Sequence, residues 1–139
     1  MRVFSEFERA LSIISALDEG EPALDVVREA ERSVKRVLRD SPDYAAPMGH
    51  LLAGCLAAVR GDRDRALMAF ERAAPGLEAA DMGYLALCAR QRYGELLGGD
   101  TGRELVRKCR EDFSQRGVVD INACLTMSTP GFRKIGTLL

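Results

Sequence analysis

The sequence predicts an all-α domain made of three stacked helical hairpins and a short C-terminal helix. Two observations carry this prediction. Apolar residues recur at i, i+3, i+4 and i+7 through most of the 139-residue chain, which is the spacing of helices that bury one face. Glycines at 20, 61, 98–99 and 117 separate these segments, and the intervals from Gly20 to Gly61 and from Gly61 to Gly99 are both roughly 40 residues, a period typical of stacked helix pairs. No alternating strand pattern competes, so we expect one all-helical domain over residues 1–139.

The first hairpin is expected over about residues 2–40. Its first helix would run from about Arg2 to Leu17 and carry an apolar stripe of Phe4, Phe7, Leu11, Ile14 and Leu17. Its second helix would begin with Pro22 in the first turn, where the missing N–H has no partner to lose, and end near Leu38.

The second hairpin is expected over about residues 43–79. Pro42 and Pro47 indicate a helix start, and this helix would end near Arg60. Asp62 is positioned to cap the next helix. The pair Pro75-Gly76 should end or kink that helix.

The third hairpin is expected over about residues 81–117. Asp81 would cap its first helix, and Gly98–Gly99 would end it. Thr101 and Glu104 have the form of a capping box that opens the second helix. In the C-terminal tail, residues 118–139, Asp120 is placed to cap one last short helix before Pro130.

Composition and charge exclude several classes of partner. Hydrophobic residues make up 47% of the chain and charged residues 29%, the balance of a globular protein rather than a disordered or fibrous one. Lys and Arg number 20 against 21 Asp and Glu, so the basic excess of a nucleic-acid or acidic-membrane binder is missing. The chain shows neither an N-terminal signal pattern nor 18 consecutive apolar residues. We therefore expect a cytoplasmic protein that binds neither nucleic acid nor membranes.

Part of the chain resembles the tetratricopeptide repeat. Between Gly49 and Ala80, Gly54 and Ala66 stand where that pattern needs small residues between paired helices, and Phe70 and Ala73 follow at the expected steps. The repeat-final Pro is missing, and Ala57 replaces the usual Tyr. The resemblance implies a right-handed solenoid that works as a non-catalytic protein–protein interaction module.

A second stretch resembles the C-terminal repeat region of bacterial serine/threonine protein kinases. The residues that carry it are Asp81–Val106, DMGYLALCARQRYGELLGGDTGRELV, and the later Thr129–Phe132, TPGF. The chain departs from that region after Gly117, where it reads VVDINACLTM. The Gly-rich loop, strand Lys and His-Arg-Asp loop of a kinase domain do not occur. The resemblance implies a module that docks a partner protein, a substrate protein or a second copy of the chain beside a signalling enzyme.

Two sets of residues are candidate binding sites for a protein or peptide. The first is a basic stripe at helical spacing, which would suit an acidic or phosphorylated partner: Arg28, Arg32, Lys35, Arg36 and Arg39. Its alternative is a solvated helix face, with Glu29 and Glu31 interleaved. The second is an apolar strip that would line the groove of a repeat: Met48, Leu51, Cys55 and Ala58. Its alternative is packing against a neighbouring helix.

No catalytic site, metal site or cofactor is predicted. Cys55, Cys88, Cys109 and Cys124 form no Cys-x-x-Cys pair and have no histidine at metal-ligand spacing, so we expect reduced core thiols. His50 stands alone, without a nucleophile on its side of the helix. Two alternatives to a docking module stay open: a regulatory helical domain that senses a small molecule or peptide, and an enzyme of unrecognised type.

Overall fold

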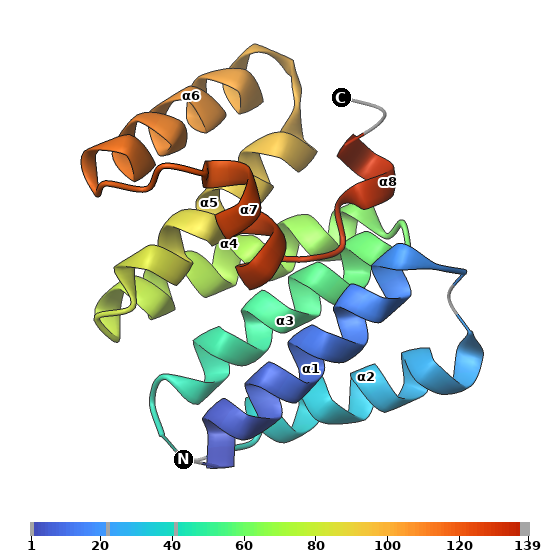
Figure 1. The fold of residues 1–139 in the computed structure, drawn as a ribbon. Helices are drawn as coiled ribbons and strands as arrows, with labels where there is room; N and C mark the ends of the chain where they lie inside the picture. Colours follow the sequence, from blue (N-terminus) through green and yellow to red (C-terminus); the bar gives the residue numbers. More distant parts are fainter. Residues whose placement is uncertain (1, 22, 41, 137–139) are drawn as a thin grey trace.

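A computed structural model describes residues 2–21, 23–40 and 42–136 of the chain, and within these ranges all regular structure is helical. The described residues form six long helices followed by two short ones, and Figure 1 shows how they are arranged. Their bounds are α1 Arg2–Glu19, α2 Leu24–Leu38, α3 Ala45–Val59, α4 Arg63–Ala79, α5 Gly83–Leu97, α6 Gly99–Gln115, α7 Ile121–Ser128 and α8 Arg133–Gly136. The all-α prediction is confirmed, whereas the predicted helix start at Pro22 lies outside the described residues.

Each long helix packs mainly against the one that follows it in the chain. α1 also packs against α3, α7 lies on α5 and α6, and α8 returns to α1 (Figure 1). The segment between α7 and α8 therefore crosses the molecule from the α5–α6 end back to the first helix.

Three of the turns use one residue in the left-handed conformation. Gly61 and Gly117 have φ of 74° and 85°, and the following amides, Asp62 N–H and Val118 N–H, return to carbonyls of the preceding helix. Asp81 occupies the same place between α4 and α5 with φ of 61°, and the amide of Met82 donates to Leu77. The prediction that Asp81 caps α5 is therefore wrong, because it closes the previous helix instead.

The prediction that Pro75-Gly76 ends α4 is wrong, whereas its alternative, a kink, stays a prediction. α4 continues through Pro75 to Ala79 rather than ending there. The neighbouring Gly76 lets α3 approach so closely that a Cβ added at Gly76 would stand 2.6 Å from Cγ of Pro47. Close packing along the whole helix thus outweighs the one backbone hydrogen bond that proline removes.

The predicted capping box at the start of α6 does not form. α6 begins at Gly99, directly after Gly98, and both glycines have positive φ. The side chain of Glu104 binds Arg107 rather than reaching back to Thr101. By contrast, the predicted caps Asp62 and Asp120 both accept a hydrogen bond from the amide three residues on.

Contacts at small residues set the helix spacing. A Cβ at Gly54 of α3 would stand 2.7 Å from the buried ring of Phe70 on α4. A Cβ at Gly102 of α6 would stand 2.5 Å from the carbonyl oxygen of Gly94 on α5. The main core runs through α1 to α5, and a smaller apolar cluster joins α5, α6 and α7.

Replacing Gly54 with Leu should overpack the α3–α4 contact, because the ring of Phe70 is fully buried and has no free volume to enter. We expect the free energy of unfolding to fall by about 1–3 kcal/mol or more. Chemical denaturation measures this change, and Gly20→Leu is the matched control, because a Cβ at Gly20 meets nothing within 4 Å. Equal losses in both variants would contradict the inferred contact.

Candidate functional site

The predicted basic stripe lies on the surface of α2. Its five members, Arg28, Arg32, Lys35, Arg36 and Arg39, are all exposed. Arg36 lies 3.8 Å from the carboxylate of Glu6 on α1. Among the described residues, no ion pair involves the other four members of the stripe. The nearby glutamates are already engaged, Glu29 with Arg9 and Glu31 with Arg60.

Beside this stripe, α2, α3 and α4 enclose a groove with a volume of about 500 Å³, named here the outer groove. Its floor is apolar and is formed by Val34, Leu38, Ala53, Leu56, Ala57 and Ala69. Its rim is charged and is formed by Glu31, Lys35, Arg60, Asp62 and Arg65. On this rim Arg60 pairs with Glu31 and Arg65 pairs with Asp62, so the excess positive charge comes from Lys35, which also belongs to the basic stripe. The outer groove therefore combines an apolar surface with a positively charged edge.

The predicted apolar strip on α3 lies in the core. Met48, Leu51, Cys55 and Ala58 are between 0% and 5% exposed. These side chains pack against neighbouring helices, which is the alternative that the sequence left open. A ligand could reach them only after other parts of the chain had moved, and binding at these residues stays a prediction.

Part of what covers α3 is the segment that joins α7 to α8. We name residues 129–133 the strap; they read Thr-Pro-Gly-Phe-Arg. The first four residues of the strap are buried. Gly131 lies directly on α3, where a Cβ in its place would stand 2.6 Å from the carbonyl oxygen of Cys55. The φ of 116° at this position also requires glycine.

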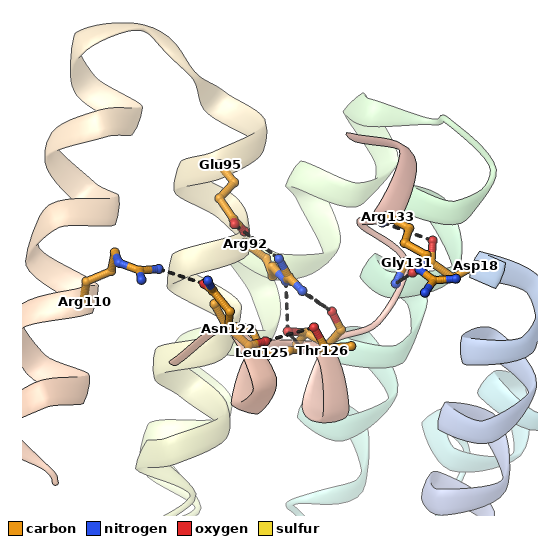
Figure 2. Close-up of polar contacts among 10 residues, drawn as sticks. Asp18, Arg92, Glu95, Arg110, Asn122, Leu125, Thr126, Gly131 and Arg133 are labelled. Carbon is orange, nitrogen blue, oxygen red and sulfur yellow. Dashed lines mark hydrogen bonds and ion pairs between the residues drawn. The ribbon is translucent and has the colours of Figure 1, made fainter. Parts of the chain in front are cut away.

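Asp18, at the end of α1, holds the backbone of the strap. Its carboxylate accepts hydrogen bonds from the amide of Gly131 at 2.9 Å and from the amide of Arg133 at 3.2 Å (Figure 2). Hydrogen bonds to an ionised acceptor are stronger than neutral ones. They connect the first helix of the chain to its last described segment.

Arg92, on α5, holds the other end of the strap. Its guanidinium donates to the carbonyl oxygen of Thr129 at 2.9 Å and 3.1 Å and to the hydroxyl of Thr129 at 3.1 Å (Figure 2). It also pairs with both carboxylate oxygens of Glu95. The side chain of Arg92 is only 9% exposed, so its charge is paired and satisfied inside the protein.

Phe132 is the apolar anchor of the strap. Its ring packs against Phe70 of α4, with 5.9 Å between centroids, and lies 4.1 Å below the guanidinium carbon of Arg92. Both geometries are favourable aromatic contacts. A polar hollow of about 400 Å³ remains beside the strap, bordered by Asp18, Arg92, Asn122, Thr126 and Arg133 among others.

Sequence reasoning missed Asp18, Arg92 and Phe132 as parts of one site. One signal was present for Arg92, because it stands between Cys88 and Leu96 in an apolar row on one face of its helix. A charged residue in such a row is an exception to the burial pattern and calls for a specific partner. No pattern in the sequence near Arg92 indicates which residue is its partner.

Three of the cysteines, Cys55, Cys88 and Cys109, are not activated as nucleophiles. Burial raises the pKa of Cys55 to about 12 and that of Cys109 to about 11. Burial, together with the neighbouring Cys124, raises the pKa of the Cys88 thiol still further above its usual range. Thiols in this state stay protonated near neutral pH and react slowly. In the described ranges, no three His, Cys, Asp or Glu side chains are arranged to hold a metal ion.

No helix in the described part of the chain is both long enough and apolar enough to cross a membrane. A scan against protein-family models, a search of curated proteins and a search of solved structures each returned no match. The site is therefore interpreted from its own geometry.

His50, on α3, should make stability depend on pH. Partial burial, and then the nearby Arg72, lower its pKa below 6.5. The unfolded chain therefore binds a proton at a pH where the folded chain does not, and stability falls as the pH drops through 6.5 toward the folded pKa. The variant His50→Gln should lack this part of the decrease in the free energy of unfolding at low pH. Urea denaturation from about pH 7.5 to about pH 5 would show it, whereas parallel curves for both proteins would contradict it.

Replacing Arg92 with Met should remove the hydrogen bonds to Thr129 and leave buried polar groups unpaired. We expect a loss of about 2–4 kcal/mol in the free energy of unfolding. The control is Arg103→Met, because Arg103 forms an exposed ion pair with Asp100, and such pairs contribute at most about 1 kcal/mol. A loss in Arg92→Met no larger than in the control would show that Arg92 does not hold the strap.

Proposed function

We propose that the chain is a non-catalytic protein–protein interaction module that docks a partner protein in the outer groove. The observation that carries the proposal is the outer groove itself, where an apolar floor lies beside the exposed cations of α2. Such a surface fits a segment that carries aliphatic residues together with Asp or Glu. The apolar contacts supply affinity, and the charges supply orientation and rate of association.

The packing of the helices supports this proposal. Consecutive helices pack in order, and a glycine of α3 meets the ring of Phe70 as the tetratricopeptide resemblance implies. We interpret the domain as a right-handed stack of three helical hairpins similar to that repeat. Stacked helix pairs present rigid surfaces whose side chains are ordered before binding, so little entropy is lost when a partner docks.

The proposed role in the cell rests on the resemblance of Asp81–Val106 and Thr129–Phe132 to the C-terminal repeat region of bacterial serine/threonine kinases. The module would hold a partner or substrate protein near a bacterial serine/threonine kinase, in the cytoplasm. The protonated buried thiols and the isolated His50 favour this docking role over an enzyme. A regulatory peptide-sensing domain is the second candidate, and the strap is the observation that favours it.

The test uses the full chain and a displayed library of random short peptides. We expect the enriched peptides to combine acidic with aliphatic residues and to bind less tightly as salt is raised. Lys35→Glu should weaken the binding of such a peptide, measured by fluorescence anisotropy, by at least about tenfold, because it reverses one charge at the groove edge.

The matched control is Lys108→Glu, which makes the same charge change at an exposed position on α6, away from the outer groove. Its affinity for the peptide should equal that of the wild type. Enriched peptides without acidic residues, or equal losses in the two variants, would refute docking in the outer groove.

A further inference from the structure

The strap is held as a bound peptide would be held. It approaches α3 from a side that differs from the outer groove: Cys55 and Val59 meet Gly131, whereas Ala53, Leu56 and Ala57 face the groove. Its contacts come from four helices, with Asp18 on α1, Cys55 on α3, Phe70 on α4 and Arg92 on α5. We name this surface the strap site.

Most polar contacts in the strap site are to backbone. Asp18 accepts from two strap amides, and Arg92 donates to a strap carbonyl oxygen. Contacts of this kind hold an extended segment without regard to most of its side chains, as in other modes of peptide recognition. A different segment with the same backbone course would satisfy the same groups.

At three strap positions, the site nevertheless selects particular residue types. Position 129 favours a hydroxyl, because the hydroxyl of Thr129 accepts a hydrogen bond from Nε of Arg92. Position 131 needs glycine, for its φ and for the approach to Cys55. Position 132 needs an aromatic ring between Phe70 and Arg92. The site therefore selects Ser or Thr at position 129, Gly at position 131 and an aromatic residue at position 132.

We propose that the strap site is a second peptide-binding site, which the chain's own strap closes in the resting molecule. Its ligand is a segment of another protein with the order Ser/Thr-x-Gly-aromatic, which displaces the strap. α8, the only element beyond the strap that the structure describes, has four residues, packs on α1 and places Ile135 against the main core. Release of the strap therefore leaves α1 to α6 in contact with one another. This site is independent of the outer groove.

A tethered strap competes strongly with a free peptide. The effective concentration of a segment on a short flexible tether is on the order of millimolar, so a free peptide of equal intrinsic affinity binds the wild-type chain only weakly. Weakening the tethered strap should therefore increase the binding of a peptide supplied in solution.

The experiment uses the full chain with Phe132→Ala and a labelled synthetic peptide that copies residues 128–136. We expect saturable binding, measured by anisotropy, at least about tenfold tighter than to the wild type. A peptide with Ala in place of its Phe should not bind. The double variant Arg92→Met with Phe132→Ala should also fail to bind, because the site loses the donor that holds the Thr carbonyl.

No binding to a folded Phe132→Ala chain, verified by circular dichroism, would overturn the proposal. A dimer of the wild type that Phe132→Ala abolishes would overturn the assignment to another protein, since the ligand would then be the strap of a second copy.

A measurement on the unaltered protein covers the case in which Phe132→Ala does not fold. In native-state hydrogen exchange, the amides of Gly131 and Arg133 should exchange by local opening, at lower free energy than the amides of α3. Exchange of both amides only through global unfolding would overturn the proposal, because the strap would then be a fixed part of the core.

Discussion

The buried guanidinium of Arg92 is the interaction on which the C-terminal part of the structure depends. It binds Glu95 on its own helix, two acceptors of Thr129 and the face of Phe132. A buried cation is costly unless all its partners are in place. The charge of Arg92 therefore forces the chain after α7 to return across α3, and this course brings Gly131 to Asp18.

The helices on which this interaction is built are spaced by contacts at glycine. Gly54 faces a ring, Gly76 faces Pro47, and Gly94 faces Gly102. Because the helices approach closely, their interior is densely packed. The outer groove and the strap site lie on different sides of α3, and the two surfaces differ in chemistry.

The two surfaces differ in how they would recognise a partner. The outer groove has an apolar floor, and on its rim Lys35 forms no ion pair with another described residue, which suits a segment with negative charge. The strap site has fixed acceptors and donors aimed at backbone, together with one aromatic pocket. Charge complementarity mainly governs the rate of association, whereas satisfied buried hydrogen bonds govern specificity.

The sequence by itself determined the helices, because periodicity and the caps at Asp62 and Asp120 act within a few residues. It did not show that α4 would end in a local turn, with Asp81 in the left-handed conformation and the amide of Met82 bonded to Leu77. Nor did it show that α4 would pass through Pro75, where Gly76 packs closely against Pro47 of α3. The strap site depended wholly on the tertiary structure. Asp18 lies 113 residues from Gly131, and Arg92 lies 37 residues from Thr129, distances over which no local pattern connects a donor to its acceptor.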